Sequence, residues 1–278
     1  MIEDAFADKL ATVSWVQNIK NLILSDERIG WPDNLPNLEE LHHGWFRPGN
    51  AEVLKRFSSD EKNCIIELGS WLGMSTKFIL ENNPNATVFA VDIWSNEHFQ
   101  TDTHYNNDSK IFADILKSHP IYDQFLVNMK KYKFDQSTSH ELKSLIPMKM
   151  DSCEALQCLH QAGISPNLIY VDANHHYDYV VKDVEMCLKL FPNAILIGDD
   201  WDNNDVKGAV QFVMQKYGQE VYVRGNTCWT FAKARIEKIF EDEQILELER
   251  NRQKRRLLEI KTRNFSDQLE VYKKKTKL

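Results

Sequence analysis

The sequence contains no long apolar run, and no segment approaches the length of a membrane span. Its first residues, Met1–Asp4, are acidic, whereas a secretory signal peptide begins with basic residues. The five cysteines are an odd number, and no two of them form a C-x-x-C pair. We therefore expect reduced cysteines, a cytoplasmic location and no membrane partner.

The sequence also has no excess of basic residues. The formal net charge of the 278 residues is −7, which argues against a protein that binds duplex nucleic acid. The composition, 42% hydrophobic and 27% charged, is that of a soluble globular protein. This length allows one large α/β domain with appendages.

A glycine turn lies between two predicted strands near the start of the core. The stretch Cys64–Thr76 reads as a buried strand, a turn with Gly69 and Gly73, and the beginning of a helix. A second strand, Thr87–Asp92, ends in an acid. Such a β-α-β unit is typical of a doubly wound sheet, which binds a nucleotide-like ligand beyond the carboxyl ends of its strands. Gly69 allows a tight turn, Gly73 allows the backbone to approach a ligand, and Asp92 can accept hydrogen bonds from a ribose diol.

The spacing of the glycines argues against a dinucleotide. The dinucleotide fingerprint is G-x-G-x-x-G, and its second glycine is absent here. The pattern Glu67-x-Gly69-x-x-x-Gly73 instead resembles motif I of class I S-adenosylmethionine-dependent methyltransferases. This resemblance implies S-adenosylmethionine as the cofactor. The residues that it places at the cofactor are Glu67, Gly69, Ser70 and Gly73, Asp92 on the ribose, and Asp151 and Ser152 beside the adenine. Trp94, two residues after Asp92, is expected to form a wall of the adenine site.

Acidic residues follow two further predicted strands. Asp172 ends the strand Leu168–Asp172, and Asp199 and Asp200 follow the apolar run that begins at Ala194. Because the carboxyl ends of parallel strands face the same side, we expect the three carboxylates to converge. Their repulsion must be relieved by a cation or by protons, and an all-oxygen set of ligands favours Mg²⁺.

A second resemblance concerns the same region. The runs Tyr170–His175 and Gly198–Trp201 resemble small-molecule O-methyltransferases of the macrocin (TylF) and Methyltransferase-24 type. In the sugar-modifying branch of these enzymes, an acid three positions before a histidine and an Asp-Asp pair bind Mg²⁺, and the histidine is the general base. The resemblance therefore assigns Mg²⁺ to Asp172, Asp199 and Asp200, and the catalytic base to His175.

Other interpretations of these residues stay open. The three acids could cap helix N-termini, where aspartate is favoured, and His175 could be a hydrogen-bonded structural residue. The family usually carries a glycine and an acid where Ala173 and Asn174 stand, which leaves one negative charge fewer near the metal. The neighbouring His176 leaves open which of the two histidines is the base.

The order of the predicted elements indicates an α/β fold, a doubly wound Rossmann-like sheet closed by an antiparallel strand. We expect an N-terminal helical cap over residues 1–61, in which Asn50 caps a short helix. The methyltransferase domain is expected over 62–234, with a lid or substrate insertion at 95–144, and a charged C-terminal helix over 235–278. The later predicted elements are strand Leu145–Met150, helix Cys153–Ala162, helix Tyr179–Leu190, strand Ala194–Asp199, helix Val206–Tyr217, and the antiparallel pair Val221–Arg224 and Cys228–Ala232.

Together these features predict an enzyme, an S-adenosylmethionine-dependent and Mg²⁺-dependent O-methyltransferase. Its partner would be a small-molecule acceptor with a hydroxyl on a sugar or a catechol-like diol, and the charged tail would allow a homodimer. The alternatives are a related metal-dependent hydroxylase, a metal-independent methyltransferase on the same fold, and a non-catalytic scaffold that recruits partners through the tail.

Overall fold

A computed structural model describes residues 2–97, 117, 120–133, 144–232, 236–238 and six single positions between 241 and 254, with side chains from residue 14 onward. The chain forms two compact units, Met1–Ala232 and Lys233–Leu278. The described residues of the second unit are helical, as predicted. The remainder of that predicted helix, and much of the predicted insertion at 95–144, lie outside the described residues.

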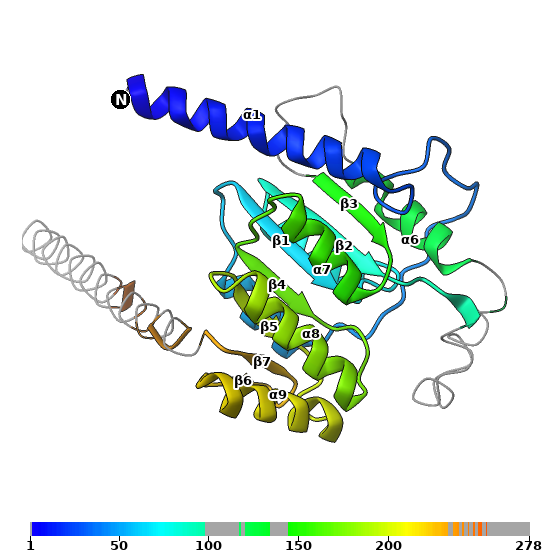
Figure 1. The fold of residues 1–278 in the computed structure, drawn as a ribbon. Helices are drawn as coiled ribbons and strands as arrows, with labels where there is room; N and C mark the ends of the chain where they lie inside the picture. The colour runs from blue at the N-terminus through cyan, green and yellow to red at the C-terminus, as the bar shows by residue number, and fades with distance from the viewer. Residues whose placement is uncertain are drawn as a thin grey trace, which may run out of the picture. The chain divides into compact units, whose positions relative to one another are not determined.

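The described strands of the first unit form one sheet in the order β3-β2-β1-β4-β5-β7-β6 (Figure 1). Strands β1 to β5 are parallel, and β7 pairs antiparallel with both β5 and β6. The strands are β1 (Asn63–Leu68), β2 (Ala86–Asp92), β3 (Ser144–Lys149), β4 (Leu168–Val171), β5 (Ile195–Gly198), β6 (Tyr222–Arg224) and β7 (Cys228–Thr230). The predicted doubly wound sheet with an antiparallel closing strand is therefore confirmed.

Helices cover both faces of this sheet, which is why its central strands are continuous apolar runs. Helices α7 (Ser152–Gln161), α8 (Tyr177–Leu190) and α9 (Asn204–Tyr217) share one hydrophobic cluster with the sheet and lie in front of it in Figure 1. Right-handed crossovers from β1 to β2 and from β4 to β5 run in opposite directions, so they place α3 (Met74–Asn82) on the face opposite α8.

The direction in which successive strands are added reverses beside β1. Strands β2 and β3 lie on one side of β1, and β4 and β5 lie on the other. A crevice opens at such a reversal, outside the carboxyl ends of the strands, and in this fold class it is the usual ligand site.

The N-terminal residues close the open edge of the sheet at β3. Helix α1 (Ile2–Ser25) contributes Ile19 to the hydrophobic core, and Ile29 then forms an antiparallel bridge with Met148. The N–H of Gly30 donates to the carbonyl of Pro147 at 2.7 Å. This cover pairs backbone groups that a sheet edge would otherwise expose.

Helix α2 (Pro48–Arg56) begins three residues earlier than predicted. Arg47 is its N-cap residue and Pro48 is its first helical residue, so the prediction that Asn50 is the cap is wrong. Proline suits the first helical position because its φ is already helical. Its lack of an N–H loses no hydrogen bond there, since the N–H of a first helical residue has no partner within the helix. Asn50 instead lies inside the helix and is fully buried.

The insertion between β2 and β3 is partly helical in the residues that the structure describes. Helix α6 (Ile121–Met129) is followed by a short 3₁₀ turn, Lys130–Tyr132. None of the described helices combines the length and the apolar character that crossing a membrane requires. The predicted cytoplasmic location stays a prediction.

Candidate active site

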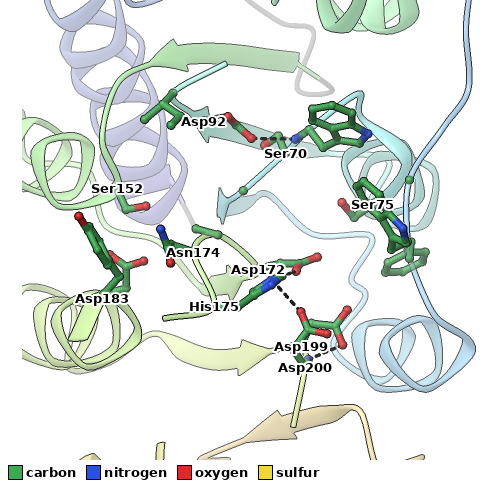
Figure 2. Close-up of a pocket in the computed structure, with 18 of the residues that line it drawn as sticks. Ser70, Ser75, Asp92, Ser152, Asp172, Asn174, His175, Asp183, Asp199 and Asp200 are labelled. Carbon is green, nitrogen blue, oxygen red and sulfur yellow. Dashed lines mark hydrogen bonds and ion pairs between the residues drawn. The ribbon is translucent and has the colours of Figure 1, made fainter. Parts of the chain in front are cut away.

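A cavity of about 500 Å³ opens at the carboxyl ends of the parallel strands. Loops that follow β1, β2, β3, β4 and β5 all contribute to its walls, together with the segment before α2 (Figure 2). Its volume lies in the range of small-molecule binding sites. The predicted site residues that line it are Gly69, Ser70, Asp92, Asp151, Ser152, Asp172, His175, Asp199 and Asp200.

The two predicted turn glycines have different roles. Gly69 lines the cavity with a left-handed backbone (φ +86°), and a Cβ there would lie 1.8 Å from the carbonyl oxygen of Asp172. Gly73 (φ +89°) is the N-cap residue of α3 and is not among the residues that line the cavity. A Cβ at Gly73 would lie 2.7 Å from the sulfur of Met129. Gly73 therefore allows close packing against α6, rather than the expected close approach to a ligand.

Glu67 lies beneath the glycine turn and is fully buried. Its carboxylate accepts hydrogen bonds from the hydroxyls of Ser70, at 2.8 Å, and Thr76. Burial raises the pKa of Glu67 to about 7. Glu67 is not among the residues that line the cavity, so in this structure it supports the turn from below.

Replacement of Glu67 with glutamine is expected to reduce the pH dependence of stability. The ordinary pKa of glutamate is 4.5, so between pH 4.5 and 7 the native protein holds a proton that the unfolded chain has released. Wild-type stability therefore falls as the pH rises through this window. We expect the loss in unfolding free energy between pH 4.5 and 8 to be about 1–3 kcal/mol smaller in the variant. Urea unfolding of both proteins at both pH values measures this difference. Equal losses in wild type and variant would contradict the conclusion that Glu67 is buried and protonated.

Asp92 is fixed by two backbone groups. Its carboxylate accepts the N–H of Trp71 at 2.9 Å and the N–H of Trp94 at 2.7 Å. Both tryptophans have left-handed backbones, with φ of +46° and +39°, so these bonds stabilise two strained turns. Asp92 is 8% exposed and faces the cavity, so its carboxylate presents oxygen atoms in a fixed orientation there.

Trp94 does not occupy the position predicted for it. Its indole is 2% exposed, and its ring lies 4.5 Å from that of Phe125 and 4.9 Å from that of Tyr122. Its Nε1–H donates to the carbonyl of Trp71. The left-handed turn directs the side chain into this aromatic cluster, and Ile93 lines the cavity instead.

Asp151 and Ser152 lie where the chain leaves β3. Asp151 is the N-cap residue of α7 and accepts the N–H groups of Cys153 and Glu154, so it also has the capping role that aspartate often takes.

Sequence reasoning missed Asp183, a buried acid of α8 that lines the same part of the cavity. Burial raises the pKa of Asp183 to about 7. The sequence feature that could have identified Asp183 is its place three residues after Val180, on the apolar stripe of the helix.

Asp172, His175 and Asp200 come together at the ends of β4 and β5 (Figure 2). The Nε2 of His175 lies 2.8 Å from Asp200 and 3.9 Å from Asp172. The hydroxyl of the buried Tyr170 donates to Asp172 at 3.3 Å. Asp200 has a left-handed backbone (φ +59°), which aspartate tolerates better than most residues.

The charges of this cluster are strongly coupled. Burial raises the pKa of Asp172 to about 8, with a further contribution from the neighbouring carboxylates. Burial alone would lower the pKa of His175, but its contacts with Asp172 and Asp200 outweigh that effect and raise it to about 10. The imidazole is therefore protonated at neutral pH in this arrangement, and a protonated imidazole cannot accept a proton as a general base.

Arg47 is the second residue that sequence reasoning missed. Its guanidinium contacts Asp199 at 3.0 Å, contacts Asp200, and binds Asp202 through two bonds of 2.9 and 3.0 Å. These partners lie more than 150 positions away in the sequence, and no local pattern connects them to Arg47. Arg47 supplies one positive charge to a cluster of carboxylates.

The donor set of the cluster fits a divalent cation. One ligand atom each from Asp172, His175 and Asp200 lies within 4.8 Å of the others. Asp199 does not join this group, because one of its oxygens accepts the N–H of Asp200 at 2.6 Å and faces Arg47. Two of the three predicted ligands, Asp172 and Asp200, therefore meet at one place together with His175. The third predicted ligand, Asp199, lies outside this group and faces Arg47.

A family model described as a methyltransferase domain (Methyltransferase-24) matches residues 66–201. The matched segment extends from β1 to the residues after β5 and contains every site residue predicted from the sequence. No curated protein matches the chain.

Solved structures similar to this chain include several methyltransferases. CalS11, a TDP-rhamnose 3'-O-methyltransferase of calicheamicin biosynthesis, is 17% identical, with a TM-score of 0.40 over 65% of this chain and 76% of that chain. MycE from the mycinamycin pathway, in complex with Mg and SAH, is 13% identical, with a TM-score of 0.40 over 64% of this chain and 47% of that chain. An O-methyltransferase from Bacillus cereus, in complex with SAH, is 16% identical, with a TM-score of 0.39 over 77% and 89%. At these TM-scores the similarities decide neither substrate nor metal.

The family match and the resemblance of motif I agree on the class of enzyme. The match covers Gly69, Asp92 and the acids after β4 and β5, all of which line the cavity. Residues 66–201 thus match the model of this methyltransferase family, and the prediction of an S-adenosylmethionine-dependent methyltransferase is confirmed.

Proposed function

We propose that the protein transfers a methyl group from S-adenosylmethionine to a hydroxyl of a small molecule with two neighbouring oxygens, and that Mg²⁺ takes part. The observation that carries this proposal is that the predicted cofactor residues and the carboxylate cluster open onto the same cavity. A methyl donor held at one end would face an acceptor held at the other.

The first half of the cavity suits the donor. The start of α3, beside the turn around Gly69, presents backbone N–H groups, which favour the carboxylate of the methionine part. Asp92 would accept hydrogen bonds from the ribose hydroxyls, and Ile93 offers an apolar surface beside it. Asp151 and Ser152 would lie at the adenine.

The second half suits an acceptor hydroxyl. In an in-line displacement, the acceptor oxygen forms a bond to the methyl carbon while the carbon–sulfur bond breaks and its electron pair returns to sulfur. The hydroxyl proton must leave, and His175 is the base nearest to the carboxylates. Mg²⁺ held by Asp172, Asp199 and Asp200 would lower the pKa of a bound hydroxyl. His175 can accept the proton once positive charge beside Asp172 and Asp200 weakens its own proton affinity.

Asp172→Asn is expected to lower kcat/KM by about 100-fold or more, since it removes a carboxylate that would hold Mg²⁺ at the point where the acceptor is activated. The matched control is Asp178→Asn, an exposed aspartate of α8 outside the cavity, which should leave activity unchanged. The assay follows S-adenosylhomocysteine release with sugars and catechols as acceptors, with Mg²⁺ or with a chelator. Full activity of the Asp172 variant would exclude the proposed role of the cluster.

A metal-independent methyltransferase is the second candidate, and the contact of Arg47 with Asp199 and Asp200 favours it. Arg47 already offsets part of the negative charge that a metal ion would neutralise. Undiminished wild-type activity in the presence of chelator would support this candidate, whereas activity restored only by Mg²⁺ would exclude it.

A further inference from the structure

Arg47 contacts two of the carboxylates that the proposed cation would use. Its Nη2 contacts one oxygen of Asp199 at 3.0 Å and one oxygen of Asp200, while its Nη1 binds both oxygens of Asp202. The side chain is only 29% exposed, so these charges interact at reduced solvent screening. Two of the three carboxylates assigned to Mg²⁺ are therefore already paired with a positive charge of the protein itself.

The backbone at Arg47 is held in place from outside the cavity. Pro48 begins α2, and Gly49 lies against the turn between β6 and β7, where a Cβ would be 2.8 Å from the hydroxyl of Thr227. One turn further, Glu52 forms a two-bond ion pair with Arg224, at 2.8 and 2.9 Å. The start of α2 is thus anchored to the sheet, and the guanidinium is presented to the carboxylates by a fixed piece of backbone.

We infer that Arg47 is a built-in competitor of the divalent cation, which holds the carboxylates of Asp199 and Asp200 when no metal is bound. The inference rests on the metal site of the proposed function. A guanidinium and a divalent cation repel each other and are attracted to the same carboxylates, so binding of one weakens binding of the other. The protein therefore offsets part of the charge of its acidic cluster without metal, at the cost of a lower metal affinity.

Arg47 also connects the proposed metal site to one wall of the cavity. Arg47 continues the segment Gly44–Phe46, which lines the cavity beside Met74 and Ser75 at the start of α3. Asp202, 44% exposed, offers Arg47 a partner outside the proposed ligand set. A metal ion would displace the guanidinium from Asp199 and Asp200, while Asp202 can retain it.

The test measures binding of Mn²⁺ alone, by calorimetry and by electron paramagnetic resonance, to the full chain without cofactor. Arg47→Met is expected to bind Mn²⁺ at least about tenfold more tightly than wild type, because a unit charge within contact distance is removed. Arg28→Met is the matched control, since Arg28 pairs with Asp26 and Glu154 and contacts none of the cluster. Its affinity should stay within about twofold of wild type. Arg47→Lys keeps the charge and should remain close to wild type.

Two results would overturn the inference. One is that Arg47→Met binds Mn²⁺ no more tightly than wild type, although a cooperative thermal transition shows that the variant is folded. This result counts whether both proteins bind Mn²⁺ or neither does. The other is an equal gain in Arg28→Met, which would reduce the effect to net charge. Methyl transfer by wild type is measured separately, so a failure of this inference leaves the proposed transfer reaction intact. Absence of methyl transfer, in contrast, leaves the Mn²⁺ comparison unaffected.

Discussion

Gly69→Ala is expected to destabilise the protein by about 3 kcal/mol or more and to abolish cofactor binding. The left-handed φ of +86° alone disfavours alanine, and the new Cβ would lie 1.8 Å from the carbonyl oxygen of Asp172 and 2.7 Å from the Cα of Ala173. These contacts are with backbone, which cannot move aside without separating the ends of β1 and β4. The N–H of Asp172 pairs there with the carbonyl of Leu68 at 2.8 Å. Urea unfolding and calorimetric titration measure the two effects.

Gly218 provides the matched control for this change. It also has a left-handed backbone (φ +61°), but a Cβ at this position would meet no atom within 4 Å. Gly218→Ala is expected to cost about 1 kcal/mol, the price of the backbone conformation alone. Similar losses for the two variants would contradict the view that the close approach of Gly69 to the backbone after β4 needs a residue without a side chain.

Asp92→Asn is expected to weaken binding of S-adenosylhomocysteine by about 100-fold. A carboxylate can accept the N–H groups of Trp71 and Trp94 and still accept bonds from a ribose diol on its remaining lone pairs. An amide has one acceptor oxygen, so the variant loses a backbone bond, the charge and part of the ribose contact. Asp26→Asn, in an acid paired with Arg28 outside the cavity, should bind normally. Unchanged affinity in Asp92→Asn would exclude the ribose role.

The positions of the strand-end acids could be predicted from the sequence because two general rules sufficed. Buried runs identify parallel strands, and the carboxyl ends of such strands face one side of the sheet. Asp92, Asp172 and Asp199 follow or end strands of this kind, and all three line the cavity. The same rules place Gly69 between β1 and α3, where the chain must turn.

The remaining features depend on contacts that no local pattern encodes. Arg47 reaches Asp202 only because Pro48 and Gly49 dock the start of α2 against the β6–β7 turn. The indole of Trp94 turns away from the cavity because its left-handed backbone directs it toward Phe125. In each case tertiary packing, rather than periodicity or spacing, determines where the side chain points.

The central claim, that this cavity binds S-adenosylmethionine, is tested most directly by calorimetric titration of the wild-type protein with S-adenosylmethionine and, separately, with NAD. The turn between Gly69 and Gly73 lacks the second glycine of a dinucleotide fingerprint, and Asp92 faces the cavity from the end of β2. We expect micromolar binding of S-adenosylmethionine at one site and no binding of NAD. Binding of NAD without binding of S-adenosylmethionine would contradict the account.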